Sequence, residues 1–184
     1  MSTLYKAALS ELEGVFERLN DEDVDKAIEL IAAADRIVVF GGGREKLQIM
    51  GFAMRLYHLG LAVAVEGDMN TPPVGEGDLF IVTVGPGEIS TALALLGVAK
   101  AAEATILVLT AQPGGRAAAF ADFVLNLPAQ TMADDQGKMK TSVLPMGSLY
   151  EGALFVLFEV MILKLIARLE VSPEAMRANH TNLE

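Results

Sequence analysis

The sequence predicts an α/β fold: a three-layer α/β/α domain built on a five-stranded parallel sheet with the flavodoxin-like strand order. Short apolar runs, typical of parallel strands buried on both faces, occur at 36–40, 61–65, 79–84, 105–109 and 123–127. Helical patterns separate most of these runs, at 45–59, 89–103 and 114–121. Strands that alternate with helices favour right-handed βαβ units.

The segments outside this core are predicted to be mostly helical. Apolar residues recur at helical spacing in two helices across 3–34, and Asn20 or Asp21 is the expected cap of the second. Residues 128–147 are a long polar loop, and loops of this length are usually functional or mobile. We therefore expect a single domain over 1–184, with N-terminal helices at 3–34, an α/β core at 36–147, and a C-terminal helix and tail at 148–184.

The C-terminal helix, about 148–170, is apolar nearly all round from Ala153 to Ile166. Such a helix needs burial on every side. A single small domain can hardly supply that burial, so we expect this helix to form an interface in a homo-oligomer.

Composition excludes several classes of function. The 184 residues include no Cys and only two His, so disulfides, thiolate chemistry and a multi-histidine metal site are not expected. The net charge of −10 argues against a nucleic-acid partner. The first residues lack the apolar core of a signal peptide, and the apolar stretch 153–166 is too short to span a membrane. We expect a cytoplasmic protein.

Two glycine-rich loops are the expected binding site. One runs from Gly41 to Lys46 after the first strand, and the other from Val84 to Thr91 after the third. In the flavodoxin-like order these strands flank the switch point where ligands bind. Glycines let backbone N–H groups approach an anion, and the helix N-termini favour negative charge. The residues expected to bind the anion or the rest of the ligand are Gly42, Gly43, Arg44, Lys46, Gly85, Gly87, Ser90 and Thr91. Arg55 is a further candidate, which either contacts the ligand or pairs with a carboxylate of the protein.

A dinucleotide site is the alternative reading of the first loop. Gly41 and Gly43 follow a strand, and Glu66 lies about twenty residues on, where an acid holds a ribose. However, Lys46 stands where that fingerprint has its third glycine, so the match is incomplete. Glycines that only make tight turns are a further possibility, which explains Gly43 well but two aligned loops less well.

At these loops the chain resembles a known family. The matching strings are Phe40-Gly-Gly-Gly-Arg44, Gly51-Phe-Ala-Met-Arg-Leu-Tyr-His-Leu-Gly60, Thr71-Pro72, Gly75-Glu-Gly-Asp78, Pro145-Met-Gly-Ser-Leu-Tyr-Glu151 and His180-Thr-Asn-Leu-Glu184. They are similar to the 6-phospho-3-hexuloisomerases of the SIS (sugar isomerase) superfamily. The resemblance runs essentially from end to end.

This resemblance implies a function and an assembly. Such an enzyme interconverts a 3-ketohexulose 6-phosphate and fructose 6-phosphate. The expectations that follow are a five-stranded SIS fold, a phosphorylated sugar as substrate, and no metal or organic cofactor. A tetramer is also expected, with an active site shared between subunits, and His180 reaching a neighbour's pocket.

The loops depart from the family pattern at two places. The family usually has Ser-Gly where this chain has Glu45-Lys46, and Ser-Gly-Ser-Gly-Glu-Thr where it has Val84 to Ile89. The second of these loops, which holds the phosphate in the family, lacks three hydroxyls here, and a hydrogen bond to a charged group is worth about 1.5–3 kcal/mol. Pro86 also lacks a backbone N–H. The alternative function is therefore a non-catalytic sugar-phosphate binding protein or sensor.

The candidate catalytic residues are Glu151, Glu88 and His180. Ketose isomerisation through an enediol(ate) needs a base that moves a proton between carbons and an acid near the oxygen. Glu151 and Glu88 each open a helix, where a carboxylate also simply complements the helix dipole. His180 is a candidate for ring opening or proton shuttling, a role in which histidine commonly serves. For His58, on an apolar helix face, a structural role is expected.

Overall fold

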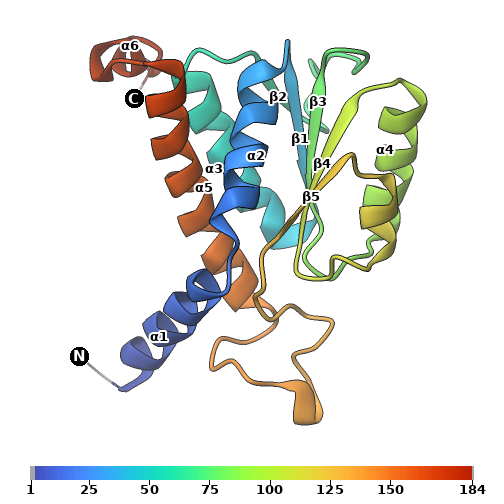
Figure 1. Ribbon diagram of the computed structural model, residues 1–184, viewed down its shortest axis with the longest axis vertical. Helices are drawn as coiled ribbons and strands as arrows, with labels where there is room; N and C mark the ends of the chain where they lie inside the picture. The colour runs from blue at the N-terminus through green and yellow to red at the C-terminus, as the bar shows by residue number, and fades with distance from the viewer. Residues whose placement is uncertain (1–2, 184) are drawn as a thin grey trace.

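The computed structural model describes residues 3–183 and contains a five-stranded, entirely parallel sheet (Figure 1). The strand order is β2-β1-β3-β4-β5, the flavodoxin-like order that the sequence predicts. The strands are β1 (Ile37–Gly41), β2 (Val63–Val65), β3 (Leu79–Thr83), β4 (Thr105–Thr110) and β5 (Phe123–Asn126). Every residue of β1 and β3 is buried, because these central strands have a covered surface on both faces.

Helices cover the two faces of the sheet unequally. The larger hydrophobic core lies on the face covered by α2 (Asp21–Ala33), α3 (Gly43–His58) and α5 (Ser148–Leu169). The smaller core lies under α4 (Ser90–Ala101) and the 3₁₀ helix η1 (Arg116–Phe120). The remaining helical elements are α1 (Thr3–Glu17), a second 3₁₀ turn η2 (Gly137–Met139) and α6 (Pro173–Ala178). This confirms the three-layer α/β/α architecture.

Helix caps follow from the residues at the helix starts. Asn20, rather than Asp21, caps α2 and accepts a hydrogen bond from the N–H of Glu22 at 3.2 Å. Ser172 caps α6 through the N–H of Ala175, and Pro173 takes the first helical position. The expected helix over 114–121 is a 3₁₀ helix of five residues.

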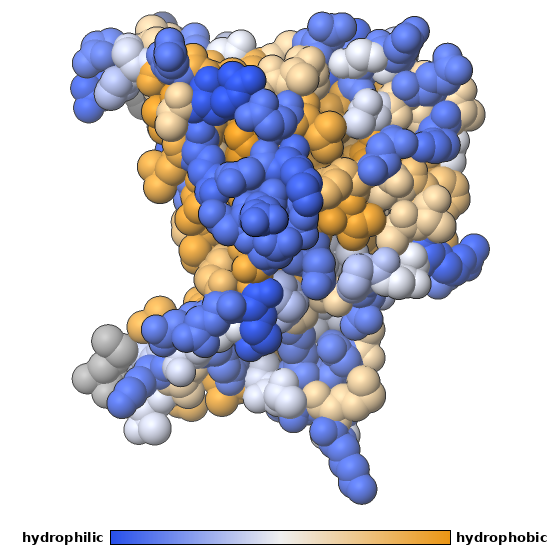
Figure 2. All heavy atoms as spheres, in the orientation of Figure 1, coloured by the Kyte–Doolittle hydropathy of each residue, from blue (hydrophilic) through white to orange (hydrophobic). Residues whose placement is uncertain are grey.

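Helix α5 has a buried face and an exposed face within this chain. Phe158 stacks on Phe52 of α3 with ring centroids 4.4 Å apart, and Leu157 is also buried. Phe155 is 59% exposed and Leu163 65% exposed. Figure 2 shows hydrophobic side chains along the margin of the molecule where α5 runs in Figure 1. The chain alone therefore does not bury α5 on every side, and Leu157 belongs to the core of the chain rather than to an interface.

Different segments of the chain lie at the carboxyl and amino ends of the strands. The carboxyl ends of the strands, at the bottom of Figure 1, face the start of α3, the start of α5 and the loop 127–147. The C-terminal segment with α6 lies at the opposite, amino edge. Among residues 3–183, no helix combines the length and apolar character needed to cross a bilayer.

Candidate active site

The β1–α3 and β3–α4 loops lie side by side at the carboxyl edge of the sheet. β1 and β3 are neighbours, and their register pairs Gly41 with Thr83. Since α3 and α4 begin just beyond these strands, both helices direct their N-termini toward this edge. The Cδ1 atom of Ile89 lies 3.1 Å from where a Cβ on Gly42 would be, so the loops are in contact.

The carboxylate of Glu45, in the first turn of α3, joins the two loops. Its Oε2 atom accepts a hydrogen bond from the hydroxyl of Thr83 at 2.7 Å, and the N–H of Gly85 lies 3.1 Å from each carboxylate oxygen. The hydroxyl of Tyr150 on α5 lies 3.2 Å from the Thr83 oxygen. Glu45 is only 7% exposed. An acidic group of the protein itself thus occupies donors in the loop that the sequence analysis assigns to a phosphate.

Burial raises the pKa of Glu45 above its ordinary value, because a carboxylate loses hydration inside the protein. The hydrogen bonds from Thr83 and Gly85 oppose this shift, and the negative charge of Glu151 adds to it. Gly85 has to be glycine, since a Cβ there would lie 2.8 Å from the Tyr150 ring and 3.0 Å from Glu45 Oε1. Burial, followed by the charge of Glu45, raises the pKa of Tyr150 well above its ordinary value.

Glu151 and Arg44 form an ion pair beside this cluster. Arg44 Nη2 lies 3.0 Å from Glu151 Oε2, and the Glu151 side chain is 16% exposed. Arg44 also donates to the hydroxyl of Ser148 at 3.1 Å and to the carbonyl of Met146. Burial raises the pKa of Glu151, while the Arg44 cation opposes that shift. A partly buried carboxylate with a raised pKa is a better base than an exposed one, and is suited to accept and return a proton.

The loop before α5 places Glu151 at the site. Gln130 holds this loop together, because its side-chain amide donates to the carbonyls of Asp134 and Met139 and accepts from the N–H of Ser142. Gly147, with φ of 76°, leads into α5. A Cβ on Gly147 would lie 2.9 Å from the backbone nitrogen of Met132, so only glycine allows this close approach. The first turn of α5 is thereby fixed against the carboxyl edge.

Several residues named from the sequence have other contacts. Lys46 Nζ donates to the carbonyl of Glu66 at 3.1 Å. Glu88 is paired with Arg116 at 2.6 Å, and both side chains are about half exposed or more. Arg55 Nε lies 3.5 Å from Glu159 Oε1, which is within ion-pair distance but lacks hydrogen-bond geometry.

Residues named from the second loop are close to the site. Ser90 and Thr91 are exposed in the first turn of α4. Gly87 makes a tight turn with φ of 79°, and a Cβ there would lie 2.7 Å from the Cβ of Gln112. In the first loop, Gly42 caps α3 and Gly43 has φ of 55°. The structure therefore brings both glycine loops, Arg44 and Glu151 together.

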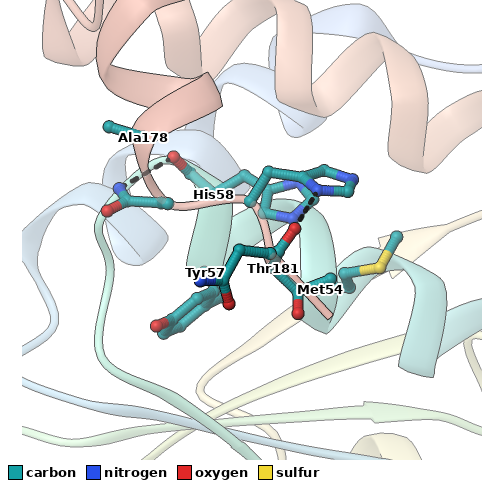
Figure 3. Close-up of a pocket in the computed structure, with 8 residues that line it drawn as sticks. Met54, Tyr57, His58, Ala178 and Thr181 are labelled. Atoms are coloured by element: carbon teal, nitrogen blue, oxygen red, sulfur yellow. Dashed lines mark hydrogen bonds between the residues drawn. The ribbon is translucent and has the colours of Figure 1, made fainter. Parts of the chain in front are cut away.

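His180 lies far from these residues in its own chain. Its ring stacks on that of His58, at the C-terminal end of α3, with centroids 5.1 Å apart. Asn179 donates to the His58 carbonyl at 3.2 Å. Figure 3 shows the cavity at this place, about 640 Å³ in volume, which is lined by Met54, Tyr57, His58 and residues 178–182. Because α3 begins at the carboxyl edge and ends near the amino edge, the cavity at its C-terminal end lies away from the candidate active site.

Sequence reasoning missed the roles of Glu45, Thr83 and Tyr150. It treated Glu45 only as a departure from a family pattern. The signal available was an acidic residue in the first turn of a helix directly after a buried strand. Thr83 gave a weaker signal, as a hydroxyl at the last position of an otherwise apolar strand.

Comparisons with known proteins agree with this architecture. A model of the SIS domain family matches residues 30–154. A protein named 3-hexulose-6-phosphate isomerase from Bacillus subtilis is 33% identical over 176 residues, which are 96% of this chain and 95% of that protein. A protein with the same name from Methylomonas aminofaciens is 34% identical over 184 residues, covering the whole of both chains.

A solved structure is similar over the same length. It is that of a hypothetical protein from Methanococcus jannaschii, described as inferring a molecular function of 3-hexulose-6-phosphate isomerase. Its TM-score is 0.84, with 25% sequence identity and 98% coverage of each chain.

The buried Glu45 carboxyl predicts a pH dependence of stability. Its folded pKa is raised, so above pH 4.5, the ordinary value for glutamate, the folded state holds more protons than the unfolded state. The free energy of unfolding should then fall as pH rises through the folded pKa. In Glu45→Gln this fall should be smaller, because the side chain no longer titrates. Urea unfolding between pH 4 and pH 8 measures it.

Glu103→Gln is the matched control, since Glu103 is exposed in the turn that precedes β4. Its pH profile should follow that of the wild type. A Glu45→Gln profile that also follows the wild type would contradict the raised pKa of Glu45.

Proposed function

Because the chain belongs to the SIS domain family, we propose that it is a phosphosugar isomerase that interconverts 3-hexulose 6-phosphate and fructose 6-phosphate. The observation that carries this proposal is a sequence identity of about one third to proteins named 3-hexulose-6-phosphate isomerase. That similarity extends over essentially the full length of both chains. The 3-hexulose 6-phosphate is the 3-ketohexulose phosphate expected from the sequence. In the same proposal, the protein works in the cytoplasm.

The proposed reaction moves one proton between adjacent carbons. The Glu151 carboxylate removes the proton from C2 of 3-hexulose 6-phosphate, which gives a 2,3-enediol(ate) as the C3 carbonyl takes the negative charge. The C2 hydroxyl gives up its proton and the C3 oxyanion takes one up, while the same carboxyl group returns a proton to C3. C2 thereby becomes the ketone of fructose 6-phosphate and C3 carries the hydroxyl. Arg44, 3.0 Å from Glu151, supplies positive charge beside the developing oxyanion.

Glu151 is favoured over Glu88 as the base. The Glu151 side chain is mostly buried and pairs with Arg44 at the carboxyl edge, and burial raises its pKa. Glu88 is 49% exposed and held by Arg116. A base works best when its pKa lies near the operating pH, and it needs a site from which water is excluded. These differences support Glu151 in the catalytic role.

A sugar-phosphate binding protein without catalysis remains the second candidate. The observation that favours it is the occupation of the Gly85 N–H by the Glu45 carboxylate, since that N–H belongs to the proposed phosphate loop. Such a protein binds the phosphosugar but does not convert it.

Assembly is part of the proposal. Large apolar side chains remain exposed on two helices that pack against each other: Leu47, Met50 and Met54 on α3, and Phe155, Val160 and Leu163 on α5. Exposed apolar surface of this kind marks an interaction site. We propose that further copies of this chain cover it in a homo-tetramer, and that His180 of one copy serves the site of another.

The catalytic proposal predicts the effect of Glu151→Gln. This variant keeps the shape of the side chain and removes the base, so turnover should fall by about 10²–10⁴-fold. The wild type in deuterated water should place deuterium at C3 of fructose 6-phosphate, because the enediol exchanges its proton. Glu88→Gln should lose less than about tenfold, since its carboxylate is exposed.

A wild type that binds fructose 6-phosphate, but neither converts 3-hexulose 6-phosphate nor exchanges deuterium, would support the binding protein instead. A loss in Glu88→Gln as large as that in Glu151→Gln would contradict the choice of base.

The assembly proposal predicts the effect of charge on α5. Leu163→Asp should dissociate the tetramer, because an unpaired charge buried at an interface costs several kcal/mol. Native mass spectrometry at low micromolar concentration measures the subunit count. Val98→Asp is the control, since Val98 is 64% exposed on α4, which covers the other face of the sheet. A wild type that is a 19.5 kDa monomer would contradict the proposal.

A further inference from the structure

The Glu45 carboxylate is an anion that the protein supplies to its own anion loop. It accepts hydrogen bonds from the Gly85 N–H and the Thr83 hydroxyl, and it is almost fully buried. An acidic residue in the first turn usually serves its own helix through the dipole. Here both carboxylate oxygens face the neighbouring strand and loop, so the contact joins the two halves of the site.

A phosphosugar bound at this edge would bring a second anion close to Glu45. This step rests on the proposed function and takes the phosphate to lie at the loop from Val84 to Thr91, one of the two loops expected to bind an anion. Two like charges that share a partly dry site disfavour each other, and one of them is then protonated. The chain itself adds negative charge here, because Glu151 also acts on Glu45.

Among the described residues, no cation is paired with the Glu45 carboxylate to offset its charge. Four elements surround it: its own helix α3, strand β3, the β3–α4 loop and α5. On α3, Arg44 is paired with Glu151 and Lys46 donates to the Glu66 carbonyl. The titratable groups that face it from α5 are Tyr150 and Glu151. Among residues 3–183, no Lys, Arg or His nitrogen lies within 4.0 Å of the Glu45 carboxylate.

Glu45, Thr83 and Tyr150 can take up one proton while their carbon, nitrogen and oxygen atoms stay in place and only the hydroxyl hydrogens turn. Thr83 Oγ1 lies 2.7 Å from Glu45 Oε2 and 3.2 Å from the Tyr150 hydroxyl. A protonated Glu45 donates from Oε2 to Thr83 Oγ1, the Thr83 hydrogen turns to the Tyr150 oxygen, and the Tyr150 hydrogen turns away from Thr83. The Gly85 N–H stays bonded to Oε1. If the side chain moved out instead, Thr83 and Gly85 would need the phosphate as their new acceptor, and binding would then take up no proton.

We propose that a phosphosugar binds to the form of the protein in which Glu45 carries a proton, so that binding takes up about one proton. Glu45 then acts as a pH-sensitive gate on the phosphate loop. The raised pKa of Glu45 in the free protein, caused mainly by burial, agrees with this assignment.

Calorimetry of the wild type tests the gate directly. Fructose 6-phosphate is titrated at pH 8 in two buffers that differ in ionisation enthalpy, and the difference in heat gives the number of protons taken up. The 6-sulfate ester of the same sugar is the second probe, because it does not titrate in this range. Its affinity should fall about tenfold for each pH unit above the pKa of Glu45. Zero proton uptake with both probes, or no binding of either at millimolar concentration, would overturn the proposal.

Glu45→Gln removes the gate while keeping a side chain of the same shape. Its affinity for the sulfate ester should no longer depend on pH between 6.5 and 8.5, and at pH 8.5 it should exceed that of the wild type by about tenfold or more. Glu103→Gln should keep the dependence of the wild type. An unchanged pH slope in Glu45→Gln would overturn the proposal.

Turnover separates this proposal from the proposed function. An active wild type that takes up no proton contradicts only the gate. A wild type that takes up the proton on binding, but does not isomerise 3-hexulose 6-phosphate, supports the gate and contradicts only the enzyme. The proton uptake of the wild type needs no variant, so the result stands even where Glu45→Gln folds poorly.

Discussion

The pairing of β1 with β3 places Gly41 beside Thr83, and the composition of the candidate site follows from that register. Parallel strands end at the same edge of the sheet, so the loops after these two strands must meet there. The meeting point receives the N-termini of α3 and α4 and the first turn of α5. A shift of β3 by one residue would turn Thr83 to the other face and separate its hydroxyl from Glu45.

The carboxyl edge of the sheet carries two largely buried acidic side chains, which is unusual for a site that binds an anion. Glu45 and Glu151 are both shielded from water, and burial raises the pKa of each. Arg44 is the cation that offsets Glu151, while neutral donors hold Glu45. The arrangement favours proton chemistry on a bound sugar, because burial makes both carboxyl groups hold a proton more tightly than an exposed glutamate does. The same arrangement makes the binding of a further anion depend on whether Glu45 is protonated.

The sequence was sufficient to predict the sheet, because runs such as 79–84 and 105–109 are apolar on both faces and end at glycine-rich or polar turns. It also named Arg44 and Glu151 as candidate residues, and their functional roles stay predictions; the ion pair between them depends on how α5 packs against α3. The contact of Glu45 with Gly85 was not predictable, since it requires the register of two strands and the position of a helix together. For α5 the sequence predicted burial on every side, and only the structure distinguishes Leu157 in the core from the exposed Phe155.

A crystal structure with fructose 6-phosphate bound tests the location of the site most directly. We expect the phosphate group at the loop from Val84 to Thr91, beside Glu45, with C2 and C3 of the sugar within about 3–3.5 Å of the Glu151 carboxylate. A phosphosugar bound elsewhere, for example in the cavity beside His58, with the carboxyl edge left unchanged, would contradict the account.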